Sequence, residues 1–258
     1  LNASGIKIPD NIDYQNNSEI IREFTQYFTF GGLPELHDVP AIEKRLWLSS
    51  LYNKIFFGDL LSRYSIRNDL ALKVLVKKLA DSLKQPTSFT RMANIISSTG
   101  QKIKTDTVIE YLRYLEETCL IFSLENISSK LNDKISNKKY YIIDNGILNL
   151  FLTDSTTSLF ENMVAIHLKR HFGQELYYYI KDVEVDFYLY ESRIAIQACY
   201  NMSETATRNR EVNDLVKFAK AFPCNKLYIV TNDEESEIEV DNLRINVIPL
   251  WKFMLLKS

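Results

Sequence analysis

The chain has 258 residues, of which 46% are hydrophobic, and a formal net charge of −2. This length supports one large or several small hydrophobic cores, and the composition excludes a disordered tail. No apolar stretch reaches the length of a membrane span and no signal-type leader opens the sequence, so we expect a cytoplasmic protein without membrane partners. The three cysteines are odd in number and widely spaced, which favours free thiols over a disulfide framework.

Residues 1–70 are dominated by helical patterns. Apolar positions at helical spacing predict helices over residues 19–28 and 41–57. Between them lies a turn with the sequence Gly31-Gly32-Leu33-Pro34. An ordinary helical hairpin, in which the two glycines only relieve backbone strain, accounts for this pattern.

Residues 71–143 predict a winged helix. A helical stripe from Leu72 to Leu83 comes first, Ser88 is expected to cap a short second helix, and Gly100 makes a turn. Thr105 is expected to cap a third helix, whose buried face is Val108, Leu112 and Leu115. Two β-like runs, over residues 119–124 and 139–143, then flank a polar loop at the position of the wing.

Basic residues are concentrated in this second section. Residues 73–140 contain 12 lysines and arginines against 7 acidic residues, a local charge of +5 that favours a nucleic-acid-binding face. The outer face of the third helix carries Asp106, Glu110, Arg113 and Glu117. Its acidic side chains repel phosphates, so we expect backbone contacts rather than base reading. The candidate contacts lie before the third helix and on the wing, and are Lys102, Lys104, Lys130, Lys134, Lys138 and Lys139. A solvated basic loop on a domain used for protein contacts explains the same charges.

Helices and strands alternate from Asp144 onward. The pattern predicts a helix over 159–171, strands over 176–180, 183–190 and 193–198, a helix over 204–222, strands over 226–231 and 243–248, and a closing helix. Strands joined by a helical crossover need a mixed or parallel sheet with helices on its faces. We therefore predict an α/β domain over residues 144–258.

Oxygen-bearing side chains stand at three points of this domain. Glu161 lies near a helix start, Glu184 and Asp186 lie on one strand, and Gln197 lies with Cys199 on the next strand. A hard divalent cation needs oxygen ligands from neighbouring elements, which makes Asp186 and Glu161 the candidate metal ligands. We expect Glu161, Asp186 and Gln197 to converge on one face.

The same pattern resembles the PD-(D/E)xK motif of restriction-endonuclease-like nucleases. In this resemblance Asp186 matches the aspartate, Gln197 the glutamate and Cys199 the lysine. A neutral amide and a thiol remove one ligand charge and the cation, so the motif is interpreted as degraded. Lys181 and Arg210 are candidates to replace the missing lysine.

These residues also have an ordinary structural interpretation. Glu161 is explained as a carboxylate that the helix dipole favours, and Glu184 and Asp186 as an exposed strand face paired with Lys181 or Arg193. Magnesium is the expected cofactor only if the altered nuclease site is active.

A longer series of motifs covers nearly the whole chain. It comprises Phe30 to Glu35, Gly58 to Tyr64, Thr107-Val108 with Tyr111-Leu112, Lys139-Tyr140 with Asp144-Asn145-Gly146, Glu161-Asn162, Glu184 to Phe187, and Arg210-Glu211. In this order the motifs resemble the C-terminal region of a family of predicted bacterial and archaeal AAA-type ATPases. The resemblance implies an ATPase-lid remnant over 1–70, a winged helix over 71–143 and a domain of unknown function over 144–258. The first residue is Leu rather than Met, which agrees with a part of a longer protein.

Two functions stay open. In the first, the chain is a non-catalytic module of an AAA-type ATP-binding protein, engages DNA or a protein partner, and has its own ATPase domain as a further partner. In the second, it is a metal-dependent nuclease with an altered site. No Gly-x-x-x-x-Gly-Lys-Ser/Thr loop occurs in the sequence, so ATP is expected to bind only in that ATPase domain and this chain alone is not expected to be an enzyme.

Overall fold

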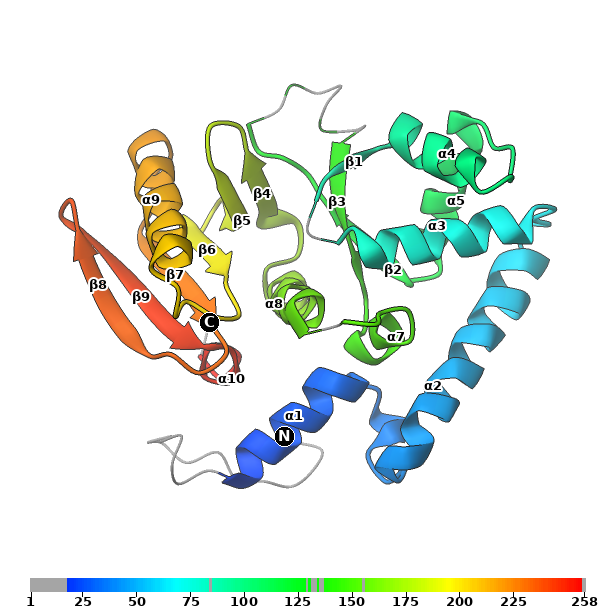
Figure 1. The fold of residues 1–258 in the computed structure, drawn as a ribbon, viewed down its shortest axis with the longest axis horizontal. Helices are drawn as coiled ribbons and strands as arrows, with labels where there is room; N and C mark the ends of the chain where they lie inside the picture. Colours follow the sequence, from blue (N-terminus) through cyan, green and yellow to red (C-terminus); the bar gives the residue numbers. More distant parts are fainter. Residues whose placement is uncertain are drawn as a thin grey trace. The chain divides into compact units, whose positions relative to one another are not determined.

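A computed structural model describes residues 18–83, 85–128, 130, 134, 137–154 and 156–256. The chain divides into two compact units, the first made of residues 1–123 with 136–155 and the second of residues 124–135 with 156–258. Helices gather in the N-terminal half and a mixed sheet lies in the C-terminal half, as predicted (Figure 1). Within the described residues, no helix has the length and apolarity needed to cross a bilayer.

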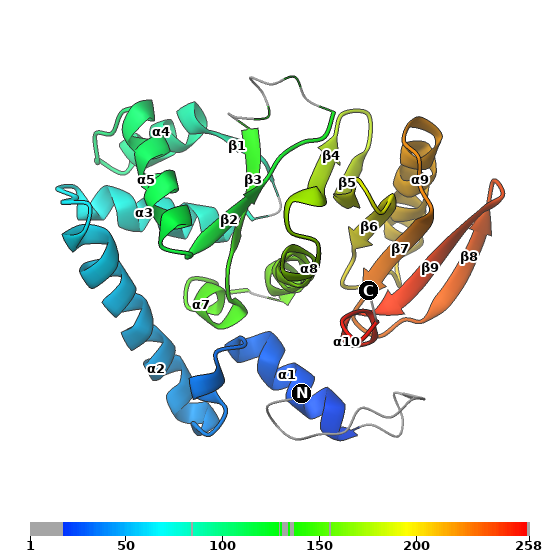
Figure 2. The same cartoon turned by 180° about the vertical axis from the view of Figure 1, so that it is seen from behind.

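The first unit combines helices with a three-stranded sheet in the order β1-β3-β2. Its elements are α1 (Ser18–Phe30), η2 (Pro34–Leu36), α2 (Ala41–Lys54), the π-helical η3 (Ile55–Ser62), α3 (Asp69–Asp81), β1 (Thr87–Ser88), α4 (Phe89–Ser98), α5 (Thr105–Glu117), β2 (Ile121–Leu124), β3 (Asn137–Ile142) and α7 (Asn145–Asn149). Figure 2 shows α3, α4 and α5 gathered beside the three strands. The predicted burial of Val108, Leu112 and Leu115 on α5 is confirmed.

Side-chain caps set the starts of two of these helices. Ser88 Oγ accepts a hydrogen bond from Arg91 N at 3.3 Å and caps α4, as predicted. Asn68 Oδ1 accepts from Ala71 N at 3.0 Å and caps α3. The prediction that Thr105 caps α5 is wrong by one position, because Thr105 is already helical and the N-cap residue, Lys104, makes no side-chain cap.

The Gly-Gly-Leu-Pro turn is fixed by the Asp144 motif, far away in the sequence. Gly32 N donates to Asp144 Oδ2 at 2.8 Å, and the other carboxylate oxygen of Asp144 caps α7 by accepting from Gly146 N at 2.8 Å. Gly31 has φ +82°, and a Cβ at this position would overlap the Asp144 carboxylate. A Cβ on Gly146 would overlap the Phe30 carbonyl. The glycines therefore permit a close approach of two chain segments and do more than relieve strain.

The second unit is built on a six-stranded sheet in the order β4-β5-β6-β7-β9-β8. Its elements are α8 (Thr156–Phe172), η4 (Gly173–Glu175), β4 (Leu176–Ile180), β5 (Glu184–Leu189), β6 (Ile194–Ala198), α9 (Thr205–Ala221), β7 (Lys226–Thr231), β8 (Ser236–Val240), β9 (Leu243–Pro249) and α10 (Leu250–Phe253). β4, β5 and β6 pair antiparallel, whereas β6, β7 and β9 run parallel. The mixed sheet is as predicted, but strand β8 was not predicted from the sequence.

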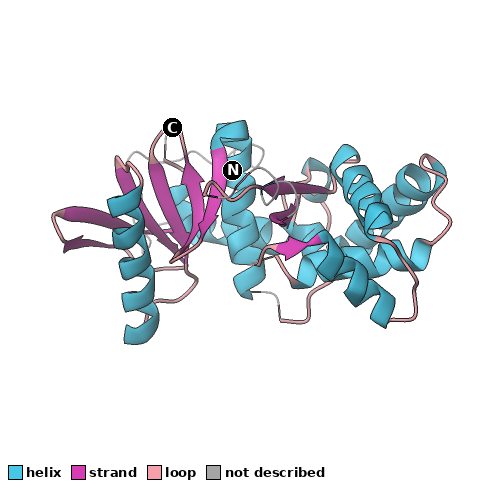
Figure 3. Cartoon of the chain, turned by 90° about the horizontal axis from the view of Figure 1, so that it is seen from above, coloured by secondary structure: helices cyan, strands magenta, loops and turns pink. Residues whose placement is uncertain are grey.

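Helices cover both faces of this sheet (Figure 3). Tyr188 on β5 pairs with Ala195 on β6, and the Tyr188 ring lies 4.9 Å from the ring of Phe218 on α9, so these side chains share the α9 face. Tyr228 on β7 contacts Phe253 of α10 at a ring distance of 5.7 Å. The same Phe253 ring lies 5.6 Å from His167 of α8. Because side chains alternate along a strand, α8 and α10 cover the opposite face.

Two features of the predicted wing need correction. Lys139 is fully buried on β3, so it is not available as a phosphate contact; the strand that it belongs to runs into the core of the first unit. The loop that follows β2 belongs to the second unit, where Asn126 forms a parallel bridge with Tyr178 of β4. This loop therefore differs from a free wing, because its first residues extend the sheet of the second unit.

Candidate functional site

Asp186 lies at an irregularity in β5. Tyr177 pairs with Tyr188 and Tyr179 pairs with Val185, so Tyr178 faces both Asp186 and Phe187. This two-against-one pairing is a β-bulge, which bends a strand and changes the direction of its side chains. The bulged residues are Asp186 and Phe187.

Gln197 holds β5 and β6 together where their backbone pairing stops. Its Oε1 accepts a hydrogen bond from Asp186 N at 3.0 Å, and its Nε2 donates to Glu184 O at 2.9 Å. The carboxamide, 2% exposed, thus takes the place of a peptide group in the ladder. In return, Asp186 Oδ2 accepts from Ala198 N at 2.9 Å. The structure brings Asp186 and Gln197 together, but through bonds that satisfy the backbone.

Cys199, which the sequence resemblance aligned with a lysine, follows the end of β6. Burial, with a smaller contribution from the nearby Glu211, raises the pKa of its thiol to about 11, so the thiol is neutral at physiological pH. Its Sγ–H donates to Asn201 O at 3.3 Å. The position therefore provides no positive charge to a water or a phosphate.

Carboxylates of α9 face the same region. Glu211 is 7% exposed. Its pKa is raised above the ordinary value, mainly by burial; the hydrogen bond from Arg210 opposes this rise, and the negative charge of Asp186 adds to it. Arg210 Nη2 donates to Glu211 Oε1 at 2.6 Å. Burial likewise raises the pKa of Asp214, and Glu184 contributes to the rise. Arg210 is thus a cation next to the site, whereas Lys181 is exposed and pairs with Asp182 at 4.0 Å. The sequence pattern did not reveal Glu211 as a member of this cluster.

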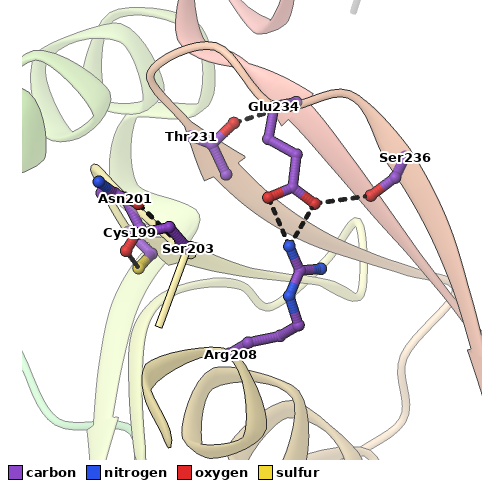
Figure 4. A network of polar contacts seen from close by, with 7 residues as sticks. All are labelled: Cys199, Asn201, Ser203, Arg208, Thr231, Glu234 and Ser236. Atoms are coloured by element: carbon purple, nitrogen blue, oxygen red, sulfur yellow. Dashed lines mark hydrogen bonds and ion pairs between the residues drawn. The ribbon is translucent and has the colours of Figure 1, made fainter. Parts of the chain in front are cut away.

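A polar network fixes α9 beside the sheet (Figure 4). Arg208, in the first turn of α9, donates from Nη2 to both carboxylate oxygens of Glu234, at 2.7 and 2.6 Å. Thr231, at the end of β7, donates from Oγ1 to Glu234 O at 2.7 Å. On the loop after β6, Ser203 N donates to Asn201 Oδ1 at 2.7 Å. These bonds hold the helix that carries Arg210 and Glu211 against the strand ends.

The two predicted metal ligands, Glu161 and Asp186, lie on α8 and β5 of the second unit. Glu161 is 4% exposed on α8, and its convergence with Asp186 stays a prediction. Among the described residues, no three His, Cys, Asp or Glu side chains are grouped so that they could hold a metal ion. The free thiols agree with the sequence, since none of the three cysteines is bonded to another.

The remaining candidate phosphate contacts are divided between the units. Lys102 and Lys104 are exposed before α5, and Lys138 is half-buried on β3. Lys130 and Lys134 belong to the second unit. Lys134 Nζ lies 5.8 Å from the centre of the Tyr177 ring, a cation–π contact.

The outer face of α5 is engaged by its own unit. Tyr64 stacks on Tyr114 at a ring distance of 3.9 Å, and its hydroxyl donates to Glu117 Oε2 at 2.8 Å. Arg113 pairs with Glu117 at 3.6 Å. These contacts engage Arg113 and Glu117, two polar side chains of the outer face.

The family comparison matches most of the first unit. Residues 21–158 match the model of a family described as a domain of unknown function, DUF8612. That range extends from α1 to the first residues of α8 and includes both the glycine turn and its Asp144 partner.

Two curated relatives resemble the chain over nearly its full length. An uncharacterized protein of Methanocaldococcus jannaschii is 34% identical over 253 residues, and the match covers 92% of this chain and 56% of the relative. An uncharacterized protein of Haemophilus influenzae is 21% identical over 247 residues, 93% of this chain and 60% of the relative. The chain therefore spans less than two thirds of each relative's length.

Proposed function

The chain belongs to the family of the domain of unknown function DUF8612, and we propose that it is a non-catalytic module that engages DNA through backbone phosphates. In this proposal the second unit is a nuclease-like scaffold without cleavage activity. The observation that carries it is the Gln197 carboxamide, whose donor and acceptor both bond to the backbone of β5. A glutamate that binds a metal has no N–H to donate to Glu184 O, so Gln197 suits sheet closure and not metal ligation.

The order of elements supports a nuclease-like ancestry for the second unit. A helix with a buried carboxylate is followed by three antiparallel strands, the second of which carries Asp186 at a bulge. A helical crossover then leads to a parallel strand. This is the arrangement that the PD-(D/E)xK resemblance implies, with Cys199 in the lysine position as a neutral thiol.

The order of elements in the first unit supports a winged helix. Helix α3, strand β1, helices α4 and α5, and strands β2 and β3 follow one another, with β3 in the middle of the sheet. Since the outer face of α5 carries acids and internal contacts, the phosphate contacts are assigned to Lys102, Lys104 and Lys138. The greater length of both relatives agrees with attachment to a further domain, which we propose is an AAA-type ATPase and the source of any ATP binding.

A metal titration with a plasmid cleavage assay tests the non-catalytic part. We expect no magnesium- or manganese-dependent cleavage by the unmodified chain. The double variant Gln197→Glu with Cys199→Lys is expected to gain metal affinity, because it restores one ligand charge and one ammonium. Cleavage by the unmodified chain that Asp186→Ala abolishes would establish the alternative, a nuclease with an altered site.

One observation favours that alternative. Glu211 and Arg210 on α9 lie in electrostatic contact with Asp186 and Cys199, so they offer a replacement carboxylate and a replacement cation. The variants Glu211→Gln and Arg210→Gln therefore accompany Asp186→Ala. If the chain is a nuclease with an altered site, each of these three variants lowers the cleavage rate. If the chain is non-catalytic, neither the unmodified chain nor the variants cleave DNA.

Binding of a duplex probe at two salt concentrations tests the DNA part. Replacing Lys102, Lys104 and Lys138 with Ala is expected to weaken binding to all sequences alike and to reduce the salt slope by roughly 0.9 for each phosphate that is no longer neutralised. The matched control replaces Lys217 and Lys226, two exposed lysines of the second unit, and leaves the slope unchanged. Absence of any binding at low salt would reject DNA and leave a protein partner.

A further inference from the structure

Helix α2 and the first residues of η3 carry large apolar side chains that point away from the core of the first unit. Ile42 is 90% exposed, Leu46 is 72% exposed and Phe57 is 51% exposed. Positions 42, 46, 49, 53 and 57 are three or four residues apart, so they lie on one side of a continuous helix. We call these residues, Ile42, Leu46, Ser49, Asn53 and Phe57, the outer stripe.

The opposite side of α2 is already packed within the first unit. Leu48 and Phe56 are buried, and the ring of Tyr52 lies 5.0 Å from the ring of Phe151, just after α7. Figures 1 and 2 show α2 running along the outside of this unit. A helix that is apolar on two faces normally packs on both. Because the described part of the first unit covers only one face, the outer stripe is a candidate contact surface.

The outer stripe is symmetric about its midpoint, which falls between Ser49 and Ser50. Large apolar side chains stand toward its two ends, Ile42 and Leu46 at one and Phe57 at the other, and small side chains stand at its centre. The Ser50 hydroxyl donates to Leu46 O at 3.0 Å within the helix, so it needs no partner in an interface. Small side chains at a crossing point let two helices approach closely. The outer stripe therefore fits an antiparallel helix with the same arrangement of side chains.

The charges beside the outer stripe are complementary in the same arrangement. Glu43 and Lys54 are exposed and lie about three helical turns apart, so they share one flank of the helix. Within the described residues, neither side chain forms an ion pair. In two antiparallel helices related by a two-fold axis, equivalent flanks face each other, so Glu43 comes opposite the partner's Lys54. By symmetry, this pair of opposite charges occurs twice.

We propose that α2 is a dimerisation helix that packs antiparallel against α2 of a second copy of this chain. The two-fold axis passes beside Ser49, so that Ile42 packs near the partner's Phe57. Leu46 packs near the partner's Asn53. Such a contact uses the same surface on both copies, so it closes after two copies and does not continue into a fibre. The inference does not depend on the proposed binding of DNA.

The small size of one helix pair predicts a weak, reversible dimer. A standard specific interface buries about 1,600 Å² in total, and a contact between two single helices buries less. The fraction of dimer should therefore rise with protein concentration in the micromolar range. Sedimentation equilibrium of the whole chain at about 1 to about 100 µM measures this rise, as an average mass that increases from 30.1 kDa toward twice that value.

A carboxylate within the outer stripe should abolish the dimer. Leu46→Glu places a charge in the apolar contact of both copies, so we expect this variant to stay monomeric at all concentrations. Its far-UV circular dichroism and its unfolding midpoint should match those of the unmodified chain, because Leu46 is exposed. Ile109→Glu replaces another exposed apolar residue of the first unit, on α5, and is the matched control. This control should dimerise as the unmodified chain does.

Exchanging two charges tests the antiparallel arrangement. Glu43→Lys and Lys54→Glu should each weaken dimerisation about threefold to tenfold, because each sets two pairs of like charges opposite each other in the dimer. The double variant should restore the dissociation constant of the unmodified chain, since it restores opposite charges at both places. Restoration cannot come from a pair within one helix, because the two positions are about three turns apart.

Three outcomes would overturn the proposal. A chain that stays monomeric at every concentration rejects the second copy as occupant and leaves the outer stripe to a partner of another kind. Dimerisation that Leu46→Glu leaves unchanged shows that another surface joins the copies. If the single charge variants weaken the dimer and the double variant does not restore it, the antiparallel pairing of α2 is wrong.

Discussion

At the scale of single residues, carboxamides act as substitutes for peptide groups where strand pairing ends. Gln197 does so between β5 and β6, and Asn126 does so beside β4. Both side chains are almost fully buried, so water cannot satisfy the backbone groups beside them, and the carboxamides provide the hydrogen-bond partners instead. A residue type that looks like a missing catalytic group is thus explained by the sheet that it closes.

Replacing Gln197 by Glu should destabilise the chain. The substitution removes the donor to Glu184 O and sets a carboxylate against that carbonyl, which costs about 1–3 kcal/mol for a buried unsatisfied group. Urea unfolding measures the decrease in stability. Gln174→Glu, at an exposed position, is the control and should stay within about 0.5 kcal/mol of the unmodified chain. Equal stabilities for both variants would contradict the role of the carboxamide.

His167 should make stability depend on pH in the acid range. Burial lowers its pKa from the ordinary 6.5 to about 4, with smaller effects of His171 and Arg170. The folded state therefore disfavours the proton: stability is unaffected above pH 6.5 and falls as the pH drops from 6.5 to about 4, by about 3 kcal/mol in total. The free energy of unfolding, measured at a series of pH values, should depend less on pH between 6.5 and about 4 in His167→Leu. The same dependence should be unchanged in His37→Leu, which replaces a histidine at the surface. An unchanged slope in His167→Leu would show that other groups cause it.

At the scale of elements, the α1–α7 junction explains why two distant motifs occur together. Asp144 bonds to the backbone of Gly32 and caps α7, while Asn145 Nδ2 donates to Phe28 O at 3.0 Å. The turn after α1 and the start of α7 are therefore one structural unit, and neither motif can change alone.

A pair of glycine variants separates steric overlap from backbone strain at this junction. Gly31 and Gly100 both have positive φ, +82° and +88°. A Cβ on Gly31 would overlap the Asp144 carboxylate, whereas a Cβ on Gly100 would have no atom within 4 Å. Gly100→Ala should cost about 1–2 kcal/mol from strain alone, and Gly31→Ala clearly more. Thermal or urea unfolding of the two variants provides the comparison. Similar decreases in stability would show that the junction relaxes around a methyl group.

At the scale of the whole molecule, the chain combines a helical unit that matches the DUF8612 model with a mixed-sheet unit that lies mostly outside the matched range. The polypeptide crosses between the units at 123–124, 135–136 and 155–156.

The chain alone should not bind ATP saturably. It contains no loop of the type whose backbone amides cradle phosphates, and its glycines at 31, 32 and 146 serve turns and close packing. Calorimetry with magnesium ATP should show no saturable heat, with inorganic phosphate as the control for general anion binding. Micromolar ATP affinity would show that the chain holds a nucleotide site of another kind.

The sequence by itself determined most of the helices and strands, because side-chain spacing encodes whether a segment has a helical or a strand-like apolar face. It also predicted the Ser88 cap and the buried face of α5. It missed β8, since Glu237 and Glu239 are unfavourable in strands; Arg244 on β9, which pairs with both, compensates them only after the hairpin has formed.

Only the tertiary structure decided what the polar residues do. Lys139 looked like part of a basic wing and is buried. Gln197 looked like an altered metal ligand and bonds to the backbone of β5, and Asn126, just after β2, pairs with Tyr178 of β4. The reason is physical: apolar periodicity is a local property of the chain, whereas the hydrogen-bond partner of a side chain depends on which distant strand comes to lie beside it.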